Sequence, residues 1–104
     1  MKKFDFHPLA REEYFDSLDY YADRSYHAGE EFLAEFEDGI QSVIKFPEAY
    51  PAIENHVPAI RRYTLSQFPF SIIYVNAAAV IYILAVAHQS RHPDYWKDRL
   101  KDIP

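Results

Sequence analysis

The chain has 104 residues, a formal net charge of −5 and no cysteine. This length fits a single domain, residues 1–104, that can bury a core without crosslinks. The lack of cysteine excludes disulfides and thiolate metal sites and favours a reducing compartment such as the cytoplasm. The longest apolar run, residues 77–87, is too short to cross a bilayer, and no apolar run follows the charged start, so we expect neither a membrane span nor a signal peptide.

The charges are divided unevenly along the chain. Residues 1–56 carry five Lys or Arg against thirteen Asp or Glu, and residues 57–104 carry six against three. No Asp or Glu occurs within residues 55–93. This split predicts one acidic face and one mildly basic face. The acidic half would repel polyanions, and nucleic-acid enzymes usually show a stronger basic excess.

The N-terminal segment predicts a short strand and a first helix. Phe4 and Phe6 alternate with polar residues in a strand that Pro8 stops. Proline suits the first turn of a helix because its missing N–H would be unpaired there. Residues 9–24 follow as a helix. Its expected apolar side holds Ala10, Tyr14, Leu18, Tyr21 and Ala22, and its expected solvated side holds Glu12, Glu13, Asp16, Asp19 and Asp23.

A second helix follows a short joint at residues 25–27. Ser25 is a suitable N-cap for it, and Pro47 ends its pattern. Its apolar positions are Phe32, Phe36, Ile40, Val43 and Ile44. We therefore expect an antiparallel helical hairpin. The expected apolar sides make alanine substitutions at Leu18 and Phe36 strongly destabilising.

Three strands are predicted after a loop at residues 47–58 that holds three prolines. In residues 59–65, Ile60, Arg62 and Thr64 fall on one side, and Arg61, Tyr63 and Leu65 fall on the other. Residues 70–76 and 79–88 are β-branched and aromatic, with a turn between them that is short enough for a hairpin. The near-continuous apolarity of the last strand predicts a central position, covered on both faces. Residues 94–100 can form one helical turn.

The predicted order is therefore β-α-α-β-β-β, with a C-terminal tail. A helical hairpin packed on a small, mostly antiparallel sheet is an α+β architecture.

This order, together with four segments, resembles the RelE/ParE family of toxins from type II toxin–antitoxin systems, closer to the ParE branch. The segments are "PLAREEYFDSLDYYADRS", "FLAEFEDGIQSVIKFPEAYP", "IRRYTLSQFPFSIIY" and "IYILAVAHQSRHPDYWKDR", and they span nearly the whole chain in register. The resemblance implies a small cytoplasmic toxin that inhibits growth until a cognate antitoxin binds it, in a module associated with plasmid stabilisation. ParE-like members are associated with inhibition of DNA gyrase by protein binding. RelE-like members are ribosome-dependent endoribonucleases that cut mRNA, and a degenerate member that only binds its antitoxin is a third alternative.

The candidate binding residues are Arg61, Arg62, Arg91, His92, Tyr95 and Trp96. An arginine on an open sheet face can bind phosphate or carboxylate with two hydrogen bonds. Because Arg61 and Arg62 alternate, at most one of them can join Arg91 on a given face. The competing interpretation is that these arginines balance the acidic helices, and that Trp96 packs the tail against the body of the domain.

His88 is the best candidate for a general acid or base if the protein is a nuclease. RNA cleavage also needs a second acid–base group and a cation, and the dense set found in RelE-like nucleases is not reproduced here. His88 and His92 have a spacing that suits a metal ion only on a helix, and Pro93 disfavours helix at His92. We therefore expect no metal and no cofactor.

Overall fold

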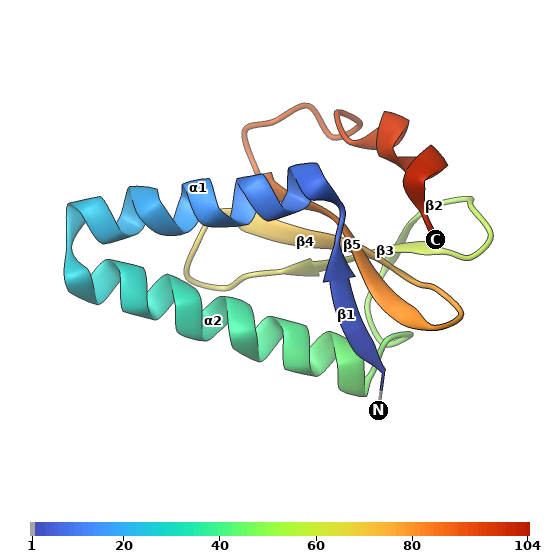
Figure 1. The fold of residues 1–104 in the computed structure, drawn as a ribbon, viewed down its shortest axis with the longest axis horizontal. Coiled ribbons are helices and arrows are strands. Elements are labelled where there is room, and N and C mark those ends of the chain that lie inside the picture. The colour runs from blue at the N-terminus through green and yellow to red at the C-terminus, as the bar shows by residue number, and fades with distance from the viewer. Residues whose placement is uncertain (1) are drawn as a thin grey trace.

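Two helices lie against one face of a five-stranded sheet (Figure 1). The computed structural model describes residues 2–104, apart from the side chain of Glu54. The elements in chain order are β1 (Lys3–Phe6), α1 (Pro8–Arg24), α2 (Tyr26–Lys45), β2 (Ala52–Glu54), β3 (Ile60–Thr64), β4 (Phe70–Asn76), β5 (Val80–His88) and a C-terminal 3₁₀ helix, η1 (Lys97–Asp102). The predicted α+β order is confirmed. One element was missed: β2 forms inside the predicted loop and pairs with β3.

The two helices begin at side-chain caps. His7, which sequence reasoning did not single out, caps α1, because its Nδ1 accepts a hydrogen bond from the Leu9 N–H at 3.1 Å. Ser25 caps α2 as predicted, since its Oγ accepts from the Ala28 N–H at 2.9 Å. The helices are joined by Ser25 alone, so the connection is shorter than the expected three residues. This tight hairpin places α1 directly beside α2.

The sheet has the order β1-β5-β4-β3-β2. β5 pairs in parallel with β1 and antiparallel with β4, and every residue from 81 to 86 is buried. The predicted central strand is therefore confirmed. The β4–β5 turn is closed by a hydrogen bond from the Ala77 N–H to the Val80 carbonyl at 3.0 Å.

A β-bulge at Leu84 changes which side chains of β5 face the helices. Ile73 pairs with Ala85 and Tyr74 pairs with Ile83, so Leu84 is an extra residue on β5. Before the bulge, Ile83 packs in the helix-side core, and after it Val86 does. Leu84 and Ala85 both pack on the opposite face. The bulge thus sets the orientation of the strand end that follows.

The sheet carries hydrophobic clusters on both faces. The cluster under the helices is built largely from aromatic rings: its buried members include Tyr14, Phe32, Phe36 and Phe70. The opposite face is partly covered by the C-terminal segment, through Trp96, Leu100 and Ile103. In Figure 1 this segment (red) follows the end of β5 and lies apart from α2. Among the described residues, no helix combines the length and the apolarity needed to cross a bilayer.

Candidate functional site

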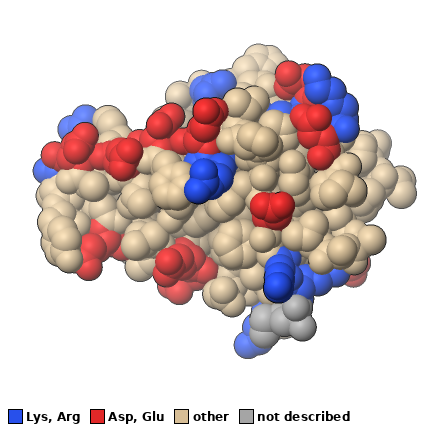
Figure 2. Space-filling view, in the orientation of Figure 1, with Lys and Arg blue, Asp and Glu red and all other residues tan. Residues whose placement is uncertain are grey.

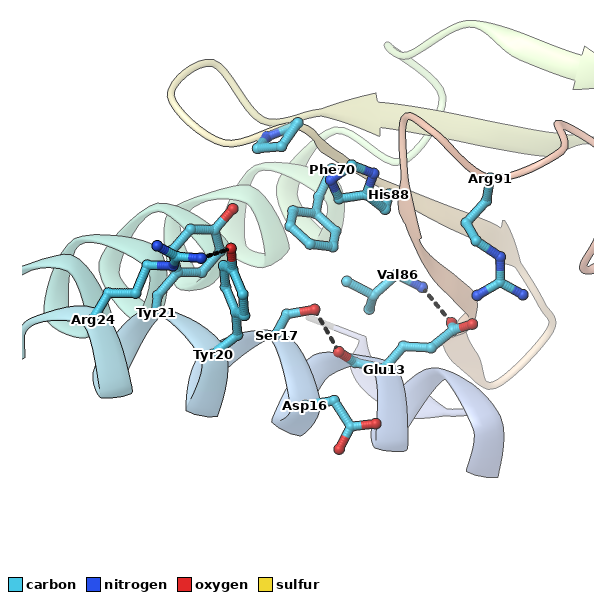
Figure 3. Close-up of a pocket in the computed structure, with 11 residues that line it drawn as sticks. Glu13, Asp16, Ser17, Tyr20, Tyr21, Arg24, Phe70, Val86, His88 and Arg91 are labelled. Carbon is cyan, nitrogen blue, oxygen red and sulfur yellow. Dashed lines mark hydrogen bonds between the residues drawn. The ribbon is translucent and has the colours of Figure 1, made fainter.

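Two clefts meet at the C-terminal end of β5, and His88 and Arg91 line both of them. One, of about 600 Å³, lies between α1 and the ends of β4 and β5 (Figure 3). We call it the helix-side cleft; its lining includes Glu13, Tyr21, Arg24 and Phe70 in addition to the shared pair. The other, of about 200 Å³, lies on the opposite side of the β5 end. We call it the cationic cleft; its lining includes Arg62, Ser71, His92 and Tyr95 in addition to the shared pair.

The cationic cleft presents positive charge and hydrogen-bond donors. No Asp or Glu is among the described residues that line it. Arg62 is exposed, and among the side chains that the structure describes its guanidinium has no hydrogen-bond or ion-pair partner. A free guanidinium beside Arg91 suits a carboxylate or a phosphate group.

The two histidines of this cleft have the same local geometry. The Nδ1 of His88 accepts from the Ser90 N–H at 3.0 Å, and the Nδ1 of His92 accepts from the Asp94 N–H at 3.1 Å. In a neutral ring whose Nδ1 accepts, the proton is on Nε2, so both rings are assigned as Nε2–H donors. Both histidines therefore add hydrogen-bond donors, and no negative charge, to the cationic cleft.

Arg61 and Arg62 lie on opposite faces of β3, as the alternation predicts, and Arg62 is the one that joins Arg91. The Arg61 Nη1 instead donates to the carbonyl oxygens of Tyr50 at 2.8 Å and Glu48 at 3.3 Å. Its guanidinium therefore anchors the loop before β2.

His88 is half-buried and packs edge-on against Phe70, with ring centroids 5.0 Å apart. Its Nδ1 also lies 2.7 Å from the Ser90 hydroxyl. In the described part of the chain, no carboxylate or lysine forms a hydrogen bond or ion pair with His88. No group of three or more His, Cys, Asp or Glu among these residues could hold a metal ion.

Tyr95 and Trp96 occupy different environments. Trp96 is 2% exposed and packs in the cluster with Ile73 and Leu84. This agrees with the competing interpretation, in which Trp96 packs the C-terminal tail against the body of the domain. The Tyr95 ring is half-buried, with the guanidinium carbon of Arg91 4.0 Å from its centroid and that of Arg99 at 5.1 Å. Tyr95 thus directly contacts Arg91, which lies where the two clefts meet; we call this meeting point, with His88 and Arg91, the rim.

A buried ion pair beneath the rim was missed by sequence reasoning. The Glu13 Oε2 accepts from the Arg99 Nη2 at 2.9 Å and from the Tyr95 hydroxyl at 2.9 Å. The Glu13 Oε1 accepts from the Arg99 Nη1 and from the Val86 N–H, both at 3.0 Å. The Arg99 Nη1 also donates to the Leu84 carbonyl at 2.9 Å.

This pair completes the edge of β5. The pairing of β1 with β5 ends at Phe6 and Ile83, so the Leu84 carbonyl and the Val86 N–H have no strand partner on that side. Glu13 and Arg99 supply the missing partners, as buried polar groups require. The expectation that Glu13 lies on the solvated side of α1 is wrong, since its side chain is 17% exposed. Glu13 follows Ala10 by three residues and therefore shares its face of α1, which was the signal in the sequence that Glu13 could be buried.

The acidic residues of both helices lie mainly on their outer surfaces, where Figure 2 shows them along the molecule. This agrees with the predicted acidic face. Exposed members include Asp16, Asp19 and Asp23 on α1 and Glu30, Glu31 and Glu37 on α2.

Comparison with known proteins identifies the family. The model of the ParE toxin of type II toxin–antitoxin systems, parDE, matches residues 4–93. A solved chain described as "Chromosomal ParDE TA system from P. aeruginosa" has the same fold, with a TM-score of 0.57 and 21% sequence identity over 85% of this chain and 96% of that chain. No curated protein matches the sequence. Since the family model covers most of the chain, the protein belongs to the ParE toxin family of type II toxin–antitoxin systems, as the sequence resemblance predicts.

Proposed function

We propose that this chain is the toxin of a toxin–antitoxin module, that it inhibits DNA gyrase by binding to it, and that a cognate antitoxin neutralises it. The match of the ParE toxin family to residues 4–93 carries this proposal. The site supports binding rather than catalysis, because the cationic cleft offers donors and cations around an apolar floor that includes Ile73 and Ala87. An acidic, partly apolar protein surface fits such a cleft.

Nucleic acid is a poorer ligand for this surface. The net charge is −5, and the outer faces of both helices are acidic, so a long polyanion would be repelled outside the cleft. His88 has no acid–base partner among the described residues, whereas cleavage of RNA needs a second such group. Cutting of mRNA on the ribosome is therefore the outcome that would contradict the proposal.

The antitoxin has a suitable surface in the helix-side cleft. Tyr21 and Phe70 line it with apolar surface, and Tyr20 and Arg24 lie at its other end (Figure 3). A groove that is apolar within and polar at its rim suits a peptide segment of a partner. We expect the product of a neighbouring gene to bind tightly in calorimetry. Failure of such a co-expressed product to bind would remove the antitoxin part of the proposal.

The direct test is to compare purified toxin in two assays. We expect inhibition of gyrase-catalysed supercoiling, with ribosome-bound mRNA left intact. Induction in bacteria without the antitoxin should likewise trigger the response to DNA damage without new transcript ends. Transcript cuts that disappear in the His88→Ala variant would replace gyrase inhibition with ribonuclease activity.

Arg91→Ala is expected to weaken gyrase inhibition about 30-fold, which corresponds to about 2 kcal/mol for an arginine hot spot. His88→Ala, compared at equal folded fraction, should leave the inhibition constant nearly unchanged, because His88 contributes no proton transfer to a binding inhibitor. The measurement is the toxin concentration that halves supercoiling. Equal losses in the two variants would contradict this assignment.

A further inference from the structure

Arg91 is an exposed residue whose guanidinium lies over an aromatic ring. Its guanidinium carbon lies 4.0 Å from the centroid of the Tyr95 ring. Among the described side chains, none forms a hydrogen bond or ion pair with this guanidinium. Figure 3 shows it projecting from the segment after β5 toward Glu13. Contact with the Tyr95 ring therefore favours one orientation among the many that an arginine can adopt.

Tyr95 is itself held from the interior. Its hydroxyl donates to the Glu13 Oε2 at 2.9 Å. Burial, and then the negative charge of Glu13, raise the pKa of Tyr95, so this hydroxyl stays protonated and remains a donor. The hydrogen bond fixes the ring at its hydroxyl end, so the ring is held in place against the Arg91 guanidinium.

Glu13 in turn is fixed to the central strand. Its two carboxylate oxygens accept from the Val86 N–H and from both Arg99 Nη atoms at 2.9–3.0 Å. A continuous series of contacts therefore runs from the backbone of β5 through Glu13 and Tyr95 to Arg91.

We propose that Glu13 and Tyr95 are positioning residues that hold Arg91 in its binding orientation at the rim shared by the two clefts. The part of this inference that concerns the target rests on the proposed function. The physical effect is preorganisation, because a side chain that is already ordered loses less conformational freedom when a partner binds. Losing this order should weaken binding by roughly 2- to 12-fold, the range for immobilising one flexible side chain.

The first experiment measures the order of Arg91 without any partner. Relaxation of the arginine ¹⁵Nε–H groups compares Arg91 with Arg62, whose guanidinium has no hydrogen-bond or ion-pair partner among the described side chains. We expect Arg91 to be more ordered than Arg62 in the native protein. Tyr95→Leu, which removes the ring, should lower the order of Arg91 to that of Arg62.

Two further variants separate positioning from general stability. Tyr95→Phe keeps the ring and removes only its link to Glu13, so it should also loosen Arg91. Tyr74→Phe is the matched control, because it removes another buried tyrosine hydrogen bond, to the Pro47 carbonyl at 2.7 Å, on the helix side of the sheet. It should leave Arg91 unchanged. An Arg91 as mobile as Arg62 in the native protein, or unaffected by both Tyr95 variants, overturns the proposal.

The second experiment is a double-mutant cycle on gyrase inhibition, with all proteins compared at equal folded fraction. Tyr95→Phe should weaken inhibition roughly 2- to 12-fold when Arg91 is present. In an Arg91→Ala background the same change should matter less than about 2-fold, because its effect passes through Arg91. A purely structural role, or direct contact of Tyr95 with the target, predicts equal losses in both backgrounds and overturns the positioning of Arg91 for binding. If the native protein does not inhibit gyrase, the proposed function fails, while the relaxation data still decide whether Arg91 is held.

Discussion

Replacing Glu13 with alanine is expected to lower the free energy of unfolding by about 3–5 kcal/mol, because it leaves a buried charge without its partner. Arg99 is 6% exposed, and its Nε already has no hydrogen-bond partner in the described structure. The substitution also leaves the Val86 N–H and the Tyr95 hydroxyl without an acceptor. Denaturant unfolding followed by circular dichroism measures the loss.

Asp16→Ala is the matched control for this prediction. Asp16 follows Glu13 by three residues on α1 and is exposed, so its loss should change the free energy of unfolding by less than about 0.5 kcal/mol. Replacing both partners with apolar residues, as in Glu13→Leu with Arg99→Met, should recover part of the lost stability. Equal effects of Glu13→Ala and Asp16→Ala would show that the pair is not buried in solution.

Replacing Phe36 with alanine should lower the free energy of unfolding by about 3–5 kcal/mol. Phe36 is 2% exposed and lies at the centre of an aromatic cluster. Its ring centroid is 4.4 Å from that of Tyr14 and 6.2 Å from those of Phe6 and Phe32. Removing the ring leaves a cavity between both helices and the sheet. Thermal and denaturant unfolding of the purified variants measure the effect.

Two comparisons calibrate that result. Leu18 is half-buried at the edge of the same cluster, so Leu18→Ala should cost about 2 kcal/mol, the lower end of the range for such substitutions. Phe15→Ala removes an aromatic ring that is 43% exposed on α1, and its effect should stay below about 1 kcal/mol. A loss at Phe36 that is no larger than at Phe15 would contradict the observed packing.

Local patterns explain why most of the fold could be predicted. The spacing of Phe32, Phe36 and Ile40 reports the buried face of α2 directly, because a helix repeats every 3.6 residues. The alternation at Arg61 and Arg62 reports the two faces of β3 in the same way. The cap at Ser25 and the proline at the start of α1 mark helix ends by local hydrogen bonding alone.

The rest depends on contacts between residues far apart in the sequence. Glu13 and Arg99 are 86 positions apart, and His7, whose Nε2 lies 2.8 Å from the Asp102 carboxylate, is 95 positions from its partner. Nothing in the local pattern around Glu13 shows that β1 ends early and leaves two backbone polar groups of β5 without a strand partner. For the same reason β2 was missed, because its three residues form a strand only by pairing with β3.

The bulge at Leu84 has a consequence for how relatives of this protein should be aligned. Side chains alternate along a strand, so one inserted or deleted residue exchanges the faces of everything that follows. A relative with the same residues but without this extra position would turn the side chain equivalent to His88 away from Phe70 and toward the other face of the sheet. In alignments of the ParE family, the residues that follow β5 should therefore be matched by their distance from the bulge. An alignment whose gap is displaced by one position from the bulge would compare side chains from opposite faces of the sheet.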